Sequence, residues 1–367
     1  MRRVALVVGV IAAMTACLGY ARAGTPPDVW DIAKDPLQRD RWALHVRVER
    51  LIHAPFADDV PPIAQRRDEQ LRLETARAML EQADAGMSPD VRLRFDLGIV
   101  YERLASDEAR NDLYGRVVDV LVPALEAAPD HPAAPEALEA LVYAYAKLDR
   151  PREELTTWRL FLARLTDDRA RVGPMMNMGE AEMRLGRLDD AIGTFRNVLH
   201  VCATLSNSSS RNSTYALTLW DLAVALDRGG DPRGAIDTAW KARELSWKEP
   251  IGLGQVREWT GWDVIRDATN VFFVPDWERE WYLALGYAAA ARGEQEPHQA
   301  ALLWGAAENH WETYAARAAA SPGEDRWLPI ARIRRDHARL ERTNAEKRTK
   351  PRARGRTDES SRGEHRL

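Results

Sequence analysis

The sequence contains very little cysteine, and this excludes several kinds of structure. Only Cys17 and Cys202 occur in 367 residues. At most one disulfide is therefore available, and there is no C-x-x-C pair of the kind that binds zinc or carries out thiol exchange. A folded protein with this composition must rely on its apolar core rather than on covalent cross-links.

Long apolar runs and a strong net charge are also missing. Beyond the N-terminus, no stretch reaches the roughly 18 apolar residues that a membrane-spanning helix needs, so we expect no transmembrane span. The formal net charge is only −4, which gives no general reason to expect a nucleic acid as a partner. Hydrophobic residues make up 45% and charged residues 29%, and these shares are typical of a folded, water-soluble protein.

Catalytic motifs are absent as well. The chain has no G-x-S-x-G, no H-E-x-x-H and no phosphate-binding loop, and its eight His residues are scattered. The four methionines between Met175 and Met183 fit a packed core better than a soft-metal site. We therefore predict that the protein is not an enzyme and that it uses no cofactor and no metal.

The N-terminus has the pattern of an export signal. Arg2 and Arg3 precede an apolar run over residues 4–13, and residues 21–23 (Ala-Arg-Ala) form a small-residue cleavage site. We expect a signal peptide over residues 1–23 and a periplasmic or outer-membrane-associated protein. In the alternative, Met14-Thr15-Ala16-Cys17 acts as a lipoprotein signal and Cys17 carries a lipid anchor. Either route leaves Cys202 without a partner for an internal disulfide.

Beyond Thr25 the dominant pattern is an apolar spacing of three and four residues, which predicts an all-α fold. Residues 36–53 and 63–85 are expected to form an opening helical pair. Residues 325–342 are expected to form a final amphipathic helix.

The helices repeat, most clearly over residues 175–199. In this unit Gly179 is a small residue that allows close helix approach, and Gly186 lies at a turn. Ala191 is a small contact on the second helix, and Phe195 fills the space behind it. The pattern resembles the tetratricopeptide repeat (TPR) motif.

Looser copies of the motif lie on both sides of this unit. The residues that correspond to Ala191 are Ala76, Val117, Glu154 and Ala235. The steps between them exceed the ~34 residues of a TPR, so each step contains a loop insertion. Glu154 departs from the pattern because a small residue is usual there. We therefore predict an α-solenoid of about five TPR-like pairs over residues 28–341.

Three segments fall outside the repeats. Residues 204–214 hold a Ser/Asn run, Ser206–Thr214, that is expected to be a surface loop. Residues 247–280 are expected to form an irregular insertion, which with Trp281 holds five of the thirteen Trp residues and contains one β-prone run, Val271–Val274. Residues 342–367 carry nine Lys or Arg against four Asp or Glu, so we expect a disordered basic tail.

The resemblance implies that the first helix of each pair lines a concave groove that binds protein partners. The groove positions that we single out are Phe95, Ile99, Tyr143, Lys147, Met176, Glu180, Arg184, Trp220 and Val224. The interpretation that follows is a non-enzymatic TPR scaffold of the bacterial cell envelope within a multiprotein assembly. Residues 271–286 more weakly resemble envelope TPR proteins of the myxobacterial gliding and secretion machinery. The alternative is a polysaccharide- or peptidoglycan-binding protein that uses the Trp-rich insertion.

Overall fold

The computed structural model describes residues 34–55, 62–108, 110–206, 208–252, 255–267, 271, 273–321 and 325–349. The chain divides into two compact units, Met1–Ala140 and Leu141–Leu367. The predicted signal peptide, the lipidation candidate Cys17 and the tail from Lys350 lie outside the described residues.

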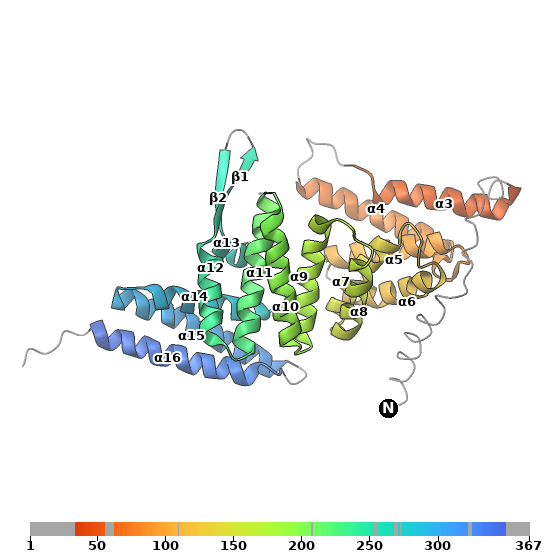
Figure 1. Cartoon of the computed structure of the whole chain (residues 1–367). Coiled ribbons are helices and arrows are strands. Elements are labelled where there is room, and N and C mark those ends of the chain that lie inside the picture. The colour runs from red at the N-terminus through yellow and green to blue at the C-terminus, as the bar shows by residue number, and fades with distance from the viewer. Residues whose placement is uncertain are drawn as a thin grey trace, which may run out of the picture. The chain divides into compact units, whose positions relative to one another are not determined.

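The first unit consists of helices that pack on their neighbours in sequence order (Figure 1). The side chain of Asp35 accepts a hydrogen bond from the backbone N–H of Leu37 and so caps the first helix, in which Pro36 is the first residue. The first two helices are the predicted opening pair. The elements are α3 (Pro36–Ile52), α4 (Pro62–Gln82), the short 3-10 turn η1 (Ala85–Met87), α5 (Val91–Glu108), α6 (Asn111–Ala127) and the start of α7 (Ala134–Lys147).

The second unit begins within α7 and continues as stacked helices, interrupted by a small hairpin. Its further helices are α8 (Pro151–Leu162), α9 (Asp168–Arg184), α10 (Leu188–Thr204), α11 (Ser209–Arg228), α12 (Pro232–Glu244), α13 (Gly261–Arg266), α14 (Glu278–Gly293), α15 (Pro297–Ala320) and α16 (Leu328–Thr349). The strands are β1 (Ser246–Gly252) and β2 (Gln255–Thr260).

The predicted equivalent positions occupy equivalent places in the structure. Glu154, Ala191 and Ala235 are each the fourth residue of the second helix of a pair, in α8, α10 and α12. Ala76 in α4 and Val117 in α6 are also buried. A buried contact that recurs on every second helix is the expected result of stacking similar helical pairs. The predicted all-α fold of TPR-like helix pairs is therefore confirmed.

The turns within the pairs share one geometry. Gly186 and Gly230 have φ values of 76° and 88°, in the left-handed region that glycine adopts without strain. At the first of these turns the N–H of Arg187 donates to the carbonyl of Glu182 at 2.9 Å, which satisfies a carbonyl at the end of α9. Asp149 takes the same position after α7, with a φ of 53°. Gly186 was correctly placed at a turn from the sequence.

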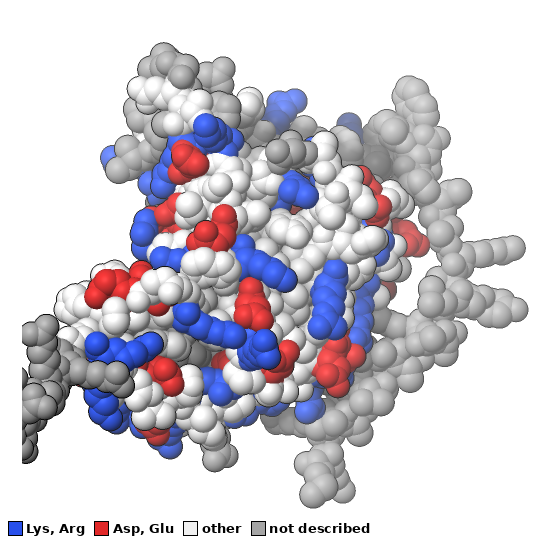
Figure 2. Space-filling model, turned by 60° about the vertical axis from the view of Figure 1, so that its left-hand side comes forward, with Lys and Arg blue, Asp and Glu red and all other residues white. Residues whose placement is uncertain are grey.

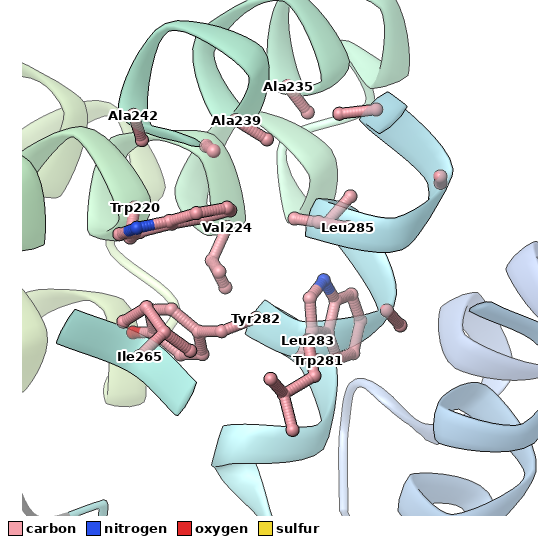
Figure 3. Packing of buried hydrophobic residues seen from close by; sticks show 14 of the residues in the cluster. Trp220, Val224, Ala235, Ala239, Ala242, Ile265, Trp281, Tyr282, Leu283 and Leu285 are labelled. Atoms are coloured by element: carbon pink, nitrogen blue, oxygen red, sulfur yellow. The ribbon is translucent and has the colours of Figure 1, made fainter. Parts of the chain in front are cut away.

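The main core of the second unit is built from aromatic side chains packed on alanines. The ring of Trp281 meets the rings of Trp311 and Tyr314 edge to face, at centroid distances of 4.9 and 5.0 Å. Figure 3 shows Trp220 beneath the alanines of α12, with the side chains of α14 on the other side of the cluster. Small residues on α12 therefore make room for the large rings of the neighbouring helices.

Two predicted insertions differ from expectation. Most of the predicted loop over residues 204–214 is helical, because Ser208 caps α11 by accepting a hydrogen bond from the N–H of Arg211 at 3.2 Å. Strands β1 and β2 pair antiparallel as a hairpin in which Trp247 lies opposite Trp259. This hairpin extends beyond the ends of α11 and α12 (Figure 1). Of the β-prone run 271–274, the residues that are described are not in a strand.

The predicted boundary of the C-terminal tail is also wrong in part. Helix α16 continues to Thr349, so the described residues 342–349 are helical rather than disordered. Ala331, Ala338 and Ala345 are buried along one side of it, and this spacing of seven residues keeps them on one helix face. Packing of α16 against α15 therefore overrides the high charge of this segment.

The surface carries both signs of charge. On the face that Figure 2 shows, Lys and Arg side chains alternate with Asp and Glu side chains. None of the described helices combines the length and apolar content needed to cross a bilayer.

Candidate functional site

The second unit encloses a cavity of about 130 Å³. Its walls come from α7, α8, α9, α11 and α14, together with the described residues of the segment that precedes α14. Three of these helices are the first members of consecutive helical pairs. The cavity therefore lies on the side of the stack where the TPR resemblance places the partner groove.

Helical spacing explains which side chains reach this cavity. On α9, Met176, Glu180 and Arg184 follow one another at intervals of four residues and share one helix face. On α11, Leu217 and Asp221 have the same spacing. Helices α9 and α11, each the first helix of its pair, therefore both direct an apolar and an acidic residue toward the cavity.

Glu154 is held at the cavity wall by a network. Arg184 donates to Glu154 Oε2 at 2.7 Å and to Asp149 Oδ1 at 2.9 Å. The indole N–H of Trp158 donates to the other oxygen of Glu154 at 3.4 Å. Burial raises the pKa of Glu154 to about 7, although Arg184 opposes this shift. The residue that departs from the repeat pattern is therefore an element of the cavity.

Asp221 is the most enclosed carboxyl of the cavity, with an exposed fraction of 3%. The hydroxyl of Tyr282 donates to Asp221 Oδ1 at 2.9 Å, whereas Oδ2 has no hydrogen-bond partner in the part of the chain that the structure describes. Burial raises the pKa of Asp221 to about 7, and the Tyr282 hydrogen bond acts in the opposite direction. One oxygen of this side chain is therefore available inside the cavity.

Glu180 adds a third carboxyl to the same wall. Burial raises its pKa well above the usual range, and the charges of Asp221 and Glu154 raise it further. Arg184 acts in the opposite direction, but its two hydrogen bonds go to Glu154 and Asp149. Glu180 and Asp221 therefore act as neighbouring like charges whenever both are ionised.

The second arginine of the cavity is also engaged. Arg228 donates to Glu278 Oε2 at 2.5 Å, and its guanidinium lies 4.4 Å from the ring centroid of Trp281. Among the described residues, no Lys, Arg or His forms an ion pair with Glu180 or Asp221. Glu180 and Asp221 can therefore accept a cation between their carboxylates. When no cation is bound, they can share a proton instead.

Four of the nine predicted groove residues meet at this cavity. They are Tyr143, Met176, Glu180 and Arg184. Lys147 is exposed near the end of α7 and does not line the cavity.

The other four predicted positions are wrong as surface positions. Trp220 and Val224 are fully buried because the insertion covers α11. The indole of Trp220 donates to the carbonyl of Gly261 at 2.9 Å and lies 5.9 Å from the ring of Trp262. In the first unit, Phe95 and Ile99 are buried, and Phe95 stacks on His131 at 4.7 Å.

Four residues of the cavity were not predicted from the sequence, namely Asp221, Arg228, Glu278 and Tyr282. On α11 the assigned face was off by one residue, since 220 and 224 were chosen whereas 217 and 221 line the cavity. The usable signal was an isolated acid, Asp221, between the buried residues Trp220 and Leu222. Glu278 and Tyr282 lie on α14, after the insertion, where the repeat spacing no longer shows which residues face the cavity.

A second group of polar residues lies in the first unit. His45, Glu49 and Asp96 place their potential ligand atoms within 4.8 Å of one another. His45 Nδ1 and Asp96 Oδ2 are 2.8 Å apart, and this hydrogen bond raises the pKa of His45. This group was not predicted from the sequence, because Asp96 is far from His45 along the chain.

Comparisons with known proteins concern the fold. No protein-family model and no curated protein matches the chain. Among solved structures, a protein from Podosopora anserina described as a kinesin light chain with nearly identical TPR-like repeats is 16% identical, with a TM-score of 0.38 over 64% of this chain and 100% of that one. A second structure from the same source has a TM-score of 0.37 at 16% identity, over 65% of this chain and 100% of that one. BtubC (BKLC) from P. vanneervenii is 14% identical, with a TM-score of 0.33 over 71% of this chain and 97% of that one.

The repeated buried contact, the shared turn geometry and the order of the helices define the class of protein. It is an all-α repeat protein built from TPR-like helix pairs.

Proposed function

We propose that the chain is a non-enzymatic scaffold of the bacterial cell envelope that binds a protein partner at the cavity of its second unit. The observation that supports this proposal is the convergence of α7, α9 and α11 on one cavity. Its walls combine aromatic, aliphatic and charged side chains, which is the composition of sites where a few anchors supply most of the affinity.

The envelope location rests on the N-terminal sequence. The basic start, the apolar run and the small-residue cleavage site support export. The mass of the purified natural protein tests this directly. A chain that begins at Gly24 supports a periplasmic protein, a lipidated Cys17 supports a membrane-anchored one, and an intact Met1 in the mature protein would contradict export.

Motility and secretion machinery is the kind of multiprotein assembly in which we place the scaffold, following the weaker likeness of residues 271–286. The burial of Trp247, Trp262 and Trp281 argues against the glycan-binding alternative, whereas Trp259 on β2 is only half-buried. Trp262 packs between Trp220 and Tyr287, where it holds the insertion against the helices.

Site-specific photo-crosslinking in the source organism tests the partner site. A photoreactive side chain at Asn177, on the cavity wall, should give a covalent adduct with a discrete protein. The matched control is Leu302, which is exposed on α15. Equal adducts at both positions, or none at Asn177, would contradict the proposed site.

A further inference from the structure

The charges around the cavity do not balance. Four carboxyl groups line it, those of Glu154, Glu180, Asp221 and Glu278, against the two guanidinium groups of Arg184 and Arg228. Each guanidinium already forms an ion pair, one with Glu154 and the other with Glu278. Among the described residues, the other two acids, Glu180 and Asp221, form no ion pair with a Lys, Arg or His.

Asp221 shows independently that an interaction is missing. Its side chain is almost completely buried, it lines the cavity, and Oδ2 has no hydrogen-bond partner. A buried oxygen without a donor is costly, and native structures rarely leave one without reason. A donor group that enters the cavity would satisfy this oxygen.

The other walls indicate which kind of donor fits. Aromatic residues from three helices and from the segment before α14 line the same space, namely Tyr143, Trp158, Tyr282 and Phe273. Tyr143 and Trp158 meet edge to face at 6.5 Å. Aromatic rings attract organic cations through their faces and also cover the apolar stem of a long basic side chain.

We propose that this cavity takes the ammonium or guanidinium group of a Lys or Arg side chain presented by the protein partner, with Glu180 and Asp221 as its counterions. This inference rests on the proposed function, since it names the chemistry of the partner. A bare divalent cation fits less well, because Ca²⁺ and Mg²⁺ need about six oxygen ligands and do not use aromatic walls. An anion fits less well too, because carboxyl groups outnumber guanidinium groups in the cavity wall.

Proton binding should be linked to occupancy. The ionisable groups that face Asp221 and Glu180 are Glu154 and Arg184, Arg228 and Glu278, and the hydroxyl of Tyr282. Burial raises the pKa of both acids, and the charge of Asp221 raises that of Glu180 further, so the two carboxyls together hold a proton near neutral pH when no cation is bound. A bound cation favours the ionised carboxylates and displaces that proton.

A peptide panel tests the inference. Acetylated and amidated Ala-Ala-X-Ala-Ala peptides, with X as Arg, Lys, norleucine, Gln or Glu, are titrated into the full-length mature protein and followed by ligand-observed NMR. We expect the Arg or Lys peptide to bind at least ~10-fold more tightly than the norleucine peptide. Equal binding of the norleucine peptide would overturn the inference.

Variants assign the binding to this cavity. Asp221→Asn and Glu180→Gln should each weaken binding of the basic peptide by ~10-fold or more. Glu182→Gln is the matched control, since Glu182 lies on the same helix, bonds to Thr194 and does not line the cavity. Thermal melts confirm that each variant is folded, and unchanged affinity in folded Asp221→Asn and Glu180→Gln would refute the assignment.

Titration with spermidine distinguishes a free polyamine from a basic side chain of a protein, since both carry organic cations. If spermidine binds and the basic peptides do not, the cavity serves a free polyamine and the side-chain inference is wrong. Failure of the wider proposal looks different. Crosslinks at Asn177 without peptide binding would leave the scaffold function standing and remove the charge specificity. Peptide binding without crosslinks would support the charge specificity of the cavity and contradict the proposed partner site.

Discussion

Tyr282 and Asp221 join α14 to α11 by a hydrogen bond of 2.9 Å inside the second unit. The hydroxyl satisfies one oxygen of a buried carboxyl and leaves the other facing the cavity. The two residues lie on different helical pairs, so the hydrogen bond forms only when α14 packs against α11. The stacking of the helices therefore determines how Asp221 is held in the cavity.

Asp221→Asn should stabilise the empty protein above neutral pH. The pKa of Asp221 is raised from 3.8 to about 7 in the folded state, so the folded chain binds more protons than the unfolded chain between these values. The free energy of unfolding therefore falls as pH rises through that window. Urea unfolding at about pH 8 should show a gain of ~1–3 kcal/mol for the variant, with no comparable gain at about pH 4. An equal loss at both pH values would contradict this linkage.

Tyr282→Phe should act in the opposite direction. It removes a hydrogen bond to a buried carboxyl, and bonds to charged groups contribute ~1.5–3 kcal/mol. We expect a loss of this size at about pH 8, where Asp221 is ionised, and a smaller loss at about pH 5. Tyr287→Phe is the control, because within the described residues its hydroxyl has no hydrogen-bond partner. A Tyr282→Phe loss no greater than that of the control would show that the bond contributes little.

Gly179→Ala should destabilise the repeat from which the fold was inferred. A Cβ at this position would lie 2.5 Å from the ring of Phe195, so α9 and α10 would have to move apart. Overpacking of this kind costs ~1–3 kcal/mol. Gly193→Ala is the matched control, since it is exposed on α10 with nothing within 4 Å of the added Cβ. It should gain ~0.5–1 kcal/mol from helix propensity. Opposite signs in denaturant unfolding confirm the close approach, and equal signs contradict it.

Arg334→Met tests the docking of the C-terminal helix. Arg334 on α16 pairs at 2.7 Å with Asp227, which is 1% exposed and also accepts from the indole of Trp281. Removal of one partner leaves a buried charge and should cost ~3–5 kcal/mol. The neighbouring Arg335 pairs with the more exposed acids Glu312 and Asp336, so Arg335→Met should cost under ~1 kcal/mol. Similar unfolding midpoints for the two variants would mean that the buried pair does not anchor α16.

The sequence predicted the fold from local signals. Gly179, Gly186, Ala191 and Phe195 specify contacts within one helical pair, and such contacts repeat with a period that can be read along the chain. The extent of α16 could not be read in this way. Its charged residues match a solvated tail in composition, and its order comes from the buried alanines that meet α15.

The residues of the cavity that were predicted from the sequence are those whose positions follow from the repeat pattern. Tyr143, Met176, Glu180 and Arg184 follow from the face that a first helix turns to the groove. Trp220 was misplaced because the insertion covers its helix, and the contact with Trp262 spans a distance in sequence that no local pattern reveals. Tyr282 was missed for the same reason, since its bond to Asp221 is long-range.

Proton release during binding tests the central claim most directly. The Arg-containing peptide is titrated calorimetrically at about pH 7 in two buffers with different ionisation enthalpies, for the natural protein and for Asp221→Asn. We expect the natural protein to release a measurable fraction of one proton per peptide and the variant to release less. Binding with no proton exchange in either protein would contradict a cavity in which two carboxyls hold a proton until a basic side chain replaces it.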